Sequence, residues 1–505
     1  MPTFRETYGT ADAKTVRTRT FTVEPGTEEI LIRGDFQPRS EADAGRSRRL
    51  VADCMRQYLA DDPELDTLTP KEAARYEESF QKLVGQVGNQ FNYTLVDPHG
   101  SQRARGNKRF LETVQLSEAK NSLGCQPGPI FAGVWELHIE AQAVVTENTE
   151  VTVEVDLNQR VTAGVAATDS RVQEEADYAE FSLQPREHWS GPGWYKGDLH
   201  SHTHHSDGSH SIAEVMASLY DRGYDFMVLS DHNTLVGYHD DLVKHMPVIP
   251  GVEVTTFYGH AVVINCCSVV EWHDLSPDAT LVDLASELRS QGAFLSIAHP
   301  FCVGDPLCSG CRWEYENFNW QAADFVEVWA GGWYERRFEN RKTLALWERL
   351  LEQGYRVTAV GSTDTHVLGT DSGDFGKTYV YAQSFSIEGI LDGLRRGQVY
   401  VSSGPEFHFQ AVSASGEAVD IGSVAISDPG ELWEFRGAVS CLPRRARLEL
   451  VCGGAVVESR WITDETASFA WQRRVEHNEW YYLRLYDGRG RLLAFTNPVY
   501  MNCVK

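Results

Sequence analysis

Between residues 194 and 403, short apolar segments alternate with stretches of helical pattern, and this alternation constrains the fold more than any other feature. Apolar runs of this length, separated by helices, are typical of strands buried on both faces of a parallel sheet. With the preceding segment GDLH they make seven expected strands, which over roughly 200 residues indicates a (β/α)7 TIM-like barrel. The other six segments are YDFMVLSD, PVIPGVEV, AVVINCC, AFLSIAHP, DFVEVWAG and RVTAVGSTD.

Strand-only patterns flank this region on both sides. Residues 1–193 contain period-two segments such as RTRTFTVEPGTEEILIRGDF and GVWELHIEAQAVV, which predict a β-sandwich. The helix-forming stretches SRRLVADCMRQYLADD and PKEAARYEESFQKLVGQVG form an insertion in it, and a polar connection covers 158–192. Residues 404–505, with RARLELVCGG and WYYLRLYDGRGRLLAF, predict a second sandwich. The expected domains are therefore 1–193, 194–403 and 404–505.

Histidines and carboxylates gather where the expected barrel strands end. The segment GDLHSHTHHSDG at 197–208 holds four histidines and two aspartates, and similar residues end later strands in VLSDHNT, IPGVEV, LSIAHP and GSTDTH. Because the carboxyl ends of barrel strands form the active-site face, we expect these side chains to converge. His260 differs, since it precedes its apolar run. The nine candidate metal ligands are His200, His202, Asp207, His232, Glu253, His260, His299, Asp364 and His366.

Imidazole and carboxylate groups together suit zinc, manganese or iron. Side chains alternate along an extended strand, so His200 and His202 point to one side, and Asp364 and His366 repeat this spacing. One zinc ion uses three or four protein ligands, so nine groups predict two or three divalent ions. A single histidine at any of these positions is more often a core or surface residue. The prediction therefore depends on the joint pattern across five segments.

The motifs resemble those of the PHP (polymerase and histidinol phosphatase) family of metallohydrolases. The resemblance covers residues 197–366 through DLHSHTHHSDG, SDHNT, EVTTFYGH, IAHP and STDTH. PGVEVTTFYGH, ENRKTLALWERLLEQG and TNPVYM are most similar to the carbaryl-hydrolase-type CehA/McbA branch. The resemblance implies a distorted seven-stranded barrel with up to three metals, two of them bridged by Glu253. The implied ligand sets are His200, His202, Glu253 and Asp364; Glu253, His260 and His299; and Asp207, His232 and His366.

Other residues near these motifs are candidates for catalysis. Glu253 and Asp364 are expected to help hold the nucleophile. His204 and His205 match no ligand position and are candidates for a general acid, although they, like His210, would otherwise be outer residues that face solvent or support the ligands.

A long loop, PFCVGDPLCSGCRWEYENFNWQA, follows the fifth expected strand and is a natural lid or substrate wall. Its aromatic residues either line an apolar pocket or fix the loop to the barrel. Its cysteines, Cys302, Cys308 and Cys311, lack an obvious fourth ligand for zinc, so packing is the favoured interpretation. The candidate substrate-binding residues are Trp313, Arg336, Arg341 and Lys377, with a solvated helix face as the alternative for Arg341.

The composition limits the partners. A net charge of -26 and a pI near 5.1 argue against nucleic acid and anionic membranes, although a local basic pocket stays open. The first twenty residues lack the apolar core of a signal peptide, and the apolar runs are too short to span a bilayer. Ten cysteines without an export signal then favour reduced thiols. We expect a cytoplasmic protein that acts on a small molecule, with homo-oligomers left open.

The expected function is metal-dependent hydrolysis, in which a metal-bound hydroxide attacks phosphorus or a carbonyl carbon. A phosphoesterase that cleaves phosphomonoesters or phosphodiesters is favoured, because groups of three metals suit that chemistry. The first alternative is carbamate, carboxylic ester or amide hydrolysis of the carbaryl-hydrolase type, which the aromatic loop favours. The second is a non-catalytic, metal-stabilised binding scaffold, which is disfavoured because none of the nine ligand positions is vacant.

Overall fold

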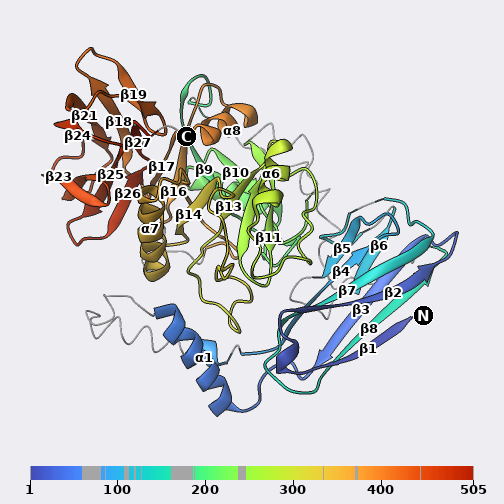
Figure 1. Cartoon of the computed structure of the whole chain (residues 1–505). Coiled ribbons are helices and arrows are strands. Elements are labelled where there is room, and N and C mark those ends of the chain that lie inside the picture. Colours follow the sequence, from blue (N-terminus) through green and yellow to red (C-terminus); the bar gives the residue numbers. More distant parts are fainter. Residues whose placement is uncertain are drawn as a thin grey trace.

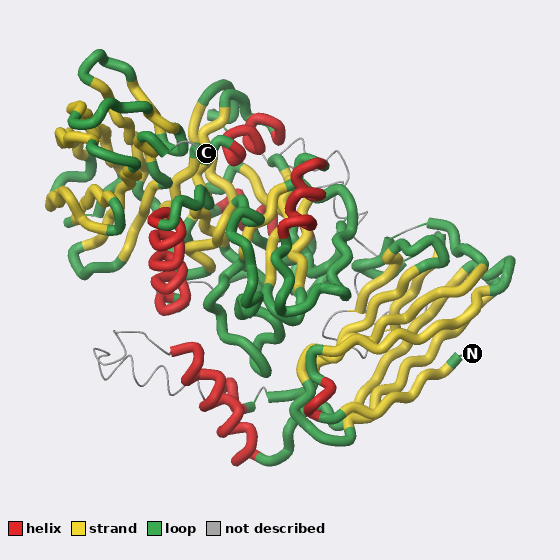
Figure 2. Tube along the Cα trace, in the orientation of Figure 1, coloured by secondary structure: helices red, strands yellow, loops and turns green. Residues whose placement is uncertain are grey.

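The structure, a computed structural model, is rich in sheet and has few helices (Figures 1 and 2). It describes residues 2–59, 81–85, 87–106, 113–118, 121–126, 128–160, 186, 188–236, 246–333, 335–369, 374–443 and 445–503. Most of the second helix-forming stretch of the expected insertion and most of the polar connection at 158–192 lie outside these residues.

The N-terminal part is a sandwich of two antiparallel four-stranded sheets, ordered β1-β8-β3-β6 and β2-β7-β4-β5. Alternate residues of each strand face the shared core, such as Ile30 and Ile32 from one sheet and Leu137 and Ile139 from the other. The strands are β1 (Thr3–Tyr8), β2 (Thr15–Val23), β3 (Glu29–Gln37), β4 (Gln90–Val96), β5 (Gln102–Gly106), β6 (Thr113–Ser117), β7 (Gly133–Ala143) and β8 (Thr149–Asn158).

The first half of the expected helical insertion is helix α1 (Ala44–Leu59), between β3 and β4 in the chain. The helix lies beside the central part of the molecule (Figure 1), and its Val51 is also buried with Val87 and Val145 of the N-terminal part. Its Tyr58 hydroxyl donates to Glu339 Oε1 at 3.0 Å, and Lys342 Nζ donates to the Tyr58 carbonyl at 2.6 Å. The insertion therefore joins the N-terminal part to the central region.

In the central region strands alternate with helices, so the predicted mixed α/β character is confirmed. The strands are β9 (Gly193–Asp198), β10 (Phe226–Leu229), β11 (Val248–Thr255), β12 (His260–Ile264), β13 (Phe294–Ile297), β14 (Phe325–Ala330), β15 (Thr358–Ser362), β16 (Lys377–Ala382) and β17 (Val399–Ser402). The helices are α4 (Ile212–Asp221), α6 (Val282–Ser290), α7 (Arg337–Glu352) and α8 (Ile387–Arg395). No helix in the described part of the chain is both long and apolar enough to cross a membrane.

One strand runs against the expected parallel arrangement. β9, β10 and β11 pair in parallel, as do β13, β14 and β15, but β12 is antiparallel to both β11 and β13. Only residues 256–259 connect β11 to β12, whereas a parallel connection needs roughly a dozen residues or more. The tight reversal places His260 opposite Thr255, so His260 lies at the carboxyl end of β11 even though it precedes its own strand.

The seven strands follow the order β15-β14-β13-β12-β11-β10-β9, and β16 then pairs with β9. Regular pairing does not close this sheet into a TIM barrel within the described residues. The two ends nevertheless meet: Ser201 and Thr365 form an isolated parallel bridge, and the Thr378 hydroxyl of β16 donates to the Gly361 carbonyl of β15 at 2.6 Å. The carboxyl ends of β9 and β15 are thereby held side by side.

The same sheet continues through β17 into the C-terminal strands β26, β25, β22 and β23. A second sheet, β19-β18-β21-β24, packs on these strands around an aromatic core that includes Phe407, Trp433 and Phe435. The expected C-terminal sandwich is thus joined to the central region by hydrogen-bonded strands. Its strands are β18 (Glu406–Ser413), β19 (Ala418–Asp420), β20 (Val424–Ala425), β21 (Glu431–Ser440), β22 (Ala446–Cys452), β23 (Ala455–Ile462), β24 (Ala467–Val475), β25 (Glu479–Asp487), β26 (Leu492–Thr496) and β27 (Val499–Met501).

Candidate metal centre

The structure brings all nine candidate ligands together at one end of the central sheet. Each belongs to at least one of four overlapping groups in which the ligand atoms lie within 4.8 Å of one another. The groups are His200, His202 and Asp364; His200, Glu253 and His299; His232, Glu253 and His260; and His202, Asp207, His232 and His366.

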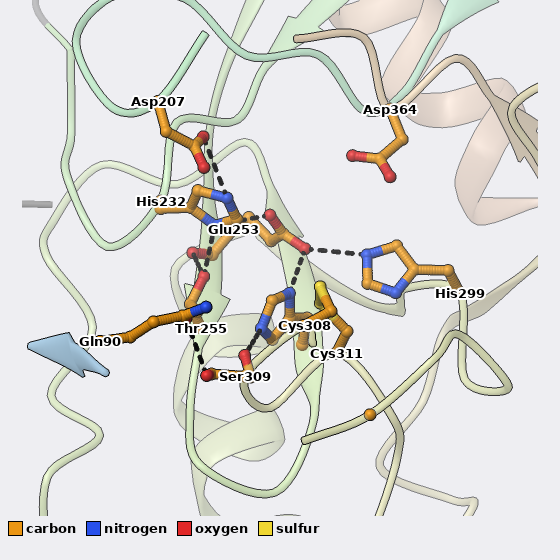
Figure 3. The surroundings of a disulfide bond; sticks show 12 residues. Gln90, Asp207, His232, Glu253, Thr255, His299, Cys308, Ser309, Cys311 and Asp364 are labelled. Carbon is orange, nitrogen blue, oxygen red and sulfur yellow. Dashed lines mark hydrogen bonds and ion pairs between the residues drawn. A yellow bond between two sulfur atoms is a disulfide. The ribbon is translucent and has the colours of Figure 1, made fainter. Parts of the chain in front are cut away.

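Glu253, which is fully buried in β11, lies at the centre of this arrangement (Figure 3). One of its carboxylate oxygens faces three imidazoles and the other faces two. From Oε2 the distances are 3.2 Å to His200 Nε2, 3.3 Å to His202 Nε2 and 2.8 Å to His232 Nδ1; from Oε1 they are 3.0 Å to His260 Nδ1 and 3.3 Å to His299 Nε2.

The donor atoms have the spacing and chemistry that a divalent metal requires. His200 Nε2 and His202 Nε2 lie 3.0 Å apart, and Asp364 Oδ1 lies 3.5 and 3.3 Å from them. Two ligands of a tetrahedral ion with bonds of 2.0–2.1 Å are about 3.3 Å apart, so the three atoms fit one ion. Glu253 Oε2 and His232 Nε2 are also buried without a hydrogen bond to any described residue. The residues therefore fit the metals that the sequence predicts.

The grouping differs from the ligand sets that the family resemblance implies, most clearly for His260 and His299. That resemblance puts His260 and His299 on one metal with Glu253. In the structure His260 groups with His232 and Glu253, while His299 groups with His200 and Glu253. Both rings still face the same Glu253 oxygen, Oε1, with His260 coming from β12 and His299 from the loop after β13.

Burial and neighbouring charge divide the histidines into two classes. Burial, together with His366 and His232, lowers the pKa of His202 to about 3, and burial lowers the pKa of His260 to about 4. For His232, burial is outweighed by Glu253 and Asp207, which raise its pKa to about 9. His202 and His260 are therefore neutral at pH 7, the form in which imidazole binds a metal.

The carboxylates are held ionised by the same cluster. Burial opposes ionisation of Glu253, but His200, His232 and His260 lower the pKa of its carboxyl well below the ordinary value. Asp364 behaves alike, because Arg336 and His200 outweigh its burial and lower its pKa. Both carboxylates are thus in the form that a cation requires.

Glu327 is a site residue that the sequence analysis does not predict. It lies in the middle of β14 with 3% of its surface exposed, where Oε1 is 3.2 Å from His200 Nδ1 and Oε2 accepts the His299 backbone N–H at 2.9 Å. A carboxylate on the far nitrogen of a ligand histidine fixes the orientation and tautomer of the ring. The available signal was a lone glutamate inside the apolar run DFVEVWAG, because a charged residue is seldom buried in a strand without a partner.

Two further buried carboxylates hold the ligand loops. Asp231 accepts hydrogen bonds from the Thr203 backbone N–H at 2.9 Å and hydroxyl at 2.7 Å, which fixes the loop of His202. Asp198 accepts hydrogen bonds from the Thr363 backbone N–H at 2.8 Å and hydroxyl at 2.6 Å, which fixes the loop of Asp364. Asp198 and Thr203 of the first motif therefore have a structural role.

Two candidate ligands have strained backbones. His299 and Asp364 have φ angles of 25° and 49°, in the left-handed region that residues other than glycine seldom adopt. Such strain persists where surrounding contacts impose it and is concentrated at functional sites. Here the Glu327 carboxylate holds the His299 N–H, and the His200 carbonyl accepts the Asp364 N–H at 2.9 Å.

His204 and His205, the candidate general acids, belong to none of the four ligand groups. They follow His202 in the loop, half-buried, with ring centroids 5.5 Å apart. The His204 N–H donates to the His210 carbonyl at 2.9 Å, and His210 Nδ1 lies 3.7 Å from Glu214. These three histidines therefore form an outer part of the loop.

The four candidate substrate-binding residues occupy different places. Arg336 is at the site, with Nη1 2.9 Å from Asp364 Oδ2. Trp313 packs against Gly259, where a Cβ would meet its ring at 2.4 Å, so it lies beside His260. Arg341 lines a groove on the outer side of α7, and Lys377 lies over the Tyr224 ring at 5.2 Å. The structure thus brings two of the four to the metal-ligand cluster.

The long loop carries a disulfide, which corrects the expectation that all ten thiols are reduced. Cys308 and Cys311 are bonded, while Cys302 is free. Between the bonded cysteines, the Ser309 carbonyl lies 3.2 Å from His260 Nε2, and its hydroxyl donates to Gln90 Oε1 of β4 at 2.8 Å (Figure 3). The disulfide loop therefore links the N-terminal sandwich to a candidate ligand.

The N-terminal sandwich also contacts the segment that follows His232. Gln102 Nε2 donates to the Asn233 carbonyl at 2.8 Å, and the Thr234 hydroxyl donates to the Gly124 carbonyl at 3.0 Å. The sequence patterns showed a sandwich but could not show that it packs on the face that bears the candidate ligands.

Comparison with known proteins gives limited further information. No protein-family model and no curated protein matches the chain. Among known structures, a two-domain protein from Bacteroides vulgatus containing a predicted PHP-like metal-dependent phosphoesterase is 15% identical, with a TM-score of 0.37 over 63% of this chain and 98% of that one. A protein from Bifidobacterium adolescentis, proposed to be a metal-dependent phosphoesterase, is 14% identical, with a TM-score of 0.25 over 34% of this chain and 87% of that one. Neither description names the CehA/McbA branch.

Proposed function

We propose that this chain is a metal-dependent hydrolase of the PHP type, and that phosphomonoesters or phosphodiesters are its substrates. The observation that carries this proposal is the convergence of five histidines on the two oxygens of Glu253. These residues come from separate strands and loops, and a shared metal ligand accounts for so many imidazoles around one buried carboxylate. A binding scaffold would have no need to keep every ligand position filled.

The four groups of side chains described above would hold two or three divalent ions, with zinc, manganese and iron as the candidates. When bound, such ions would activate a water molecule and neutralise the charge that develops on a substrate oxygen. Glu253 and Asp364 hold the centre together, and Glu327 orients His200. The proposed fold for this chemistry is the distorted seven-stranded barrel. The bridge between Ser201 and Thr365 brings the carboxyl ends of its first and last strands together.

Arg336 supports an anionic substrate. Its guanidinium lies against the Asp364 carboxylate, with Nη1 2.9 Å from Oδ2. A phosphate oxygen that approaches the cluster would meet this guanidinium, whose N–H groups match phosphate geometry. We therefore favour phosphoester over neutral carbamate substrates.

Carbamate or carboxylic ester hydrolysis, as in the carbaryl-hydrolase-type branch, is the second candidate. Trp313, beside His260, with Tyr315 and Phe318 at ring distances of 5.0 and 4.9 Å, could form one wall of an apolar pocket. However, Tyr315 is buried and its hydroxyl donates to Thr256 at 2.9 Å, as expected of a residue that fixes the loop to the sheet. The aromatic loop therefore supports this alternative only weakly.

The deciding experiment is a comparison of initial rates on bis(p-nitrophenyl) phosphate and 1-naphthyl methylcarbamate with metal-loaded protein. Asp364→Ala is the site variant, and Asp392→Ala, whose side chain in α8 pairs with Arg396, is the matched control. Release of p-nitrophenol that is abolished in the first variant and kept in the second is the expected result. Faster release of naphthol would establish the alternative instead. Bound metal without turnover of either substrate would contradict both hydrolase assignments and favour the scaffold.

A further inference from the structure

A large groove outside the metal centre is rich in arginine. It has a volume of about 1150 Å³ and lies between helix α7 and the C-terminal sheet. Seven arginines but only two carboxylates, Glu348 and Asp487, line it, in a chain whose net charge is -26. Arg337 and Arg341 come from α7, Arg445 and Arg447 from the start of β22, and Arg484, Arg489 and Arg491 from β25 and the turn after it.

Ion pairs within the protein satisfy only part of this charge. Arg484 lies 3.2 Å from Glu348 and 3.3 Å from Glu449, and Arg447 lies 3.0 Å from the same Glu449. Two cations thus share one carboxylate there. The Nε atoms of both arginines are buried and make no hydrogen bond to the part of the chain that the structure describes. Such donors are costly to leave unsatisfied.

Two exposed arginines at the rim are available to a ligand. Arg445 stacks over the Trp461 ring at 4.4 Å, and Arg489 lies at the tip of the turn between β25 and β26. Neither makes an ion pair with any described residue. Their charges therefore add to the positive potential of the groove, which its walls concentrate.

The size and charge of the groove indicate the class of ligand. A volume near 1000 Å³ is at the upper end of small-molecule sites, and arginine forks bind phosphate oxygens in pairs. A long polyanion would extend beyond the groove onto a surface that is acidic overall, whereas a short one would not. We propose that this groove is a separate binding site for a small molecule that carries several phosphate groups.

The site does not depend on the proposed hydrolase activity. None of the nine candidate ligands lines the groove, and neither does Arg336, which contacts Asp364; the next residue, Arg337, lines the groove. Trp333, which also lines the groove, packs on Trp329 with ring centroids 4.8 Å apart, so its fluorescence should report on an occupant.

The test is calorimetric titration of inorganic tripolyphosphate into full-length protein freed of metal by dialysis against a chelator. The double variant Arg445→Gln/Arg489→Gln removes the two rim charges. Arg460→Gln/Arg474→Gln, which removes two arginines of β23 and β24 that do not line the groove, is the matched control. We expect affinity to fall about tenfold or more in the first variant and less than about twofold in the second. We also expect unchanged binding in Asp364→Ala and tighter binding of tripolyphosphate than of orthophosphate.

Three results would overturn the proposal. They are equal affinity in both double variants, loss of binding in Asp364→Ala, and no heat of binding at low salt. A single-stranded oligonucleotide that binds more tightly than tripolyphosphate, with the same dependence on Arg445 and Arg489, would assign the groove to nucleic acid instead. Unfolding midpoints of the two double variants, measured in parallel, show whether a loss of binding reflects a loss of folding.

Discussion

Glu327 and His200 form a fully buried contact, with the carboxylate Oε1 3.2 Å from the imidazole Nδ1. The opposite nitrogen of the same ring, Nε2, lies 3.2 Å from Glu253 and 3.0 Å from His202 Nε2. His200 is therefore held from behind by one carboxylate while it faces the cluster with its other nitrogen. This arrangement predicts which residues outside the ligand set control metal affinity.

Replacing Glu327 with glutamine should weaken divalent-metal binding by about 10- to 100-fold, because the amide no longer supplies the charge that orients His200. Competition with a chromogenic chelator measures the change. Glu29→Gln is the control, since Glu29 is equally buried but bonds Asn158 in the N-terminal sandwich, at 2.8 Å. Equal metal affinity in the two variants would show that Glu327 has no part in the site.

The sequence predicts most of the polar geometry because position along a strand determines which end of a sheet a residue reaches. His200, His232, His299 and Asp364 all follow their strands and meet as expected. His260 could not be placed by that rule, since its position depends on the antiparallel reversal at 256–259. That nine residues converge is observed; that they bind metal stays a prediction.

Contacts between distant segments could not be read from local patterns. Glu327 has the sequence context of a core strand, and its partners, His200 and the His299 N–H, come from other segments of the chain. The link from Gln90 to Ser309 joins residues far apart in the chain, and no periodicity reports such a pair. The arginine groove likewise collects residues from α7 and from the C-terminal strands. In each case the missing information is tertiary packing.

The contact between the N-terminal sandwich and the central region should weaken in alkali. His273 Nε2 lies 3.0 Å from the buried Glu140, which also pairs with Arg105 at 2.7 Å. Burial opposes protonation of His273, but Glu140 and Glu271 outweigh it and raise its pKa to about 9. Because the unfolded imidazole titrates near 6.5, this stabilisation is complete below about pH 6.5 and is lost as the pH rises through 9.

The shift corresponds to about 3 kcal/mol of unfolding free energy at most. Glu140 acts in the opposite range: its pKa of about 2 means that its contribution, present above pH 4.5, is lost as the pH falls towards 2. Thermal unfolding midpoints from pH 6 to 9.5 measure the alkaline effect. The difference between wild type and His273→Gln should shrink as the pH rises, whereas the exposed His408→Gln should show no such trend. A difference that is constant across this range would refute the assignment.

Opening the Cys308–Cys311 disulfide should loosen the contact between the Ser309 carbonyl and His260. The double variant Cys308→Ser/Cys311→Ser is expected to lower metal affinity by up to about tenfold, because that carbonyl helps to fix the His260 ring. Equilibrium metal content of wild type and variant, with and without reductant, measures the effect. Reductant should lower the metal content of wild type and of Cys267→Ser, a control at an exposed free thiol, but not that of the double variant. If reductant affects wild type and the double variant alike, the disulfide is not the cause.

Replacing Arg336 should show whether its guanidinium binds the substrate or only holds Asp364 in place. Arg336→Gln removes a cation that lies 2.9 Å from Asp364 Oδ2, and we expect about a tenfold loss in kcat/KM for a phosphodiester, mainly through KM. A neutral carbamate would lose little, because it has no charge for the guanidinium to bind. Arg341→Gln is the matched control, since it lies one turn further along α7 and lines the arginine groove instead of the site. Equal losses on both substrates in Arg336→Gln, with a fall in kcat and in metal content, would instead make Arg336 a positioning residue for Asp364.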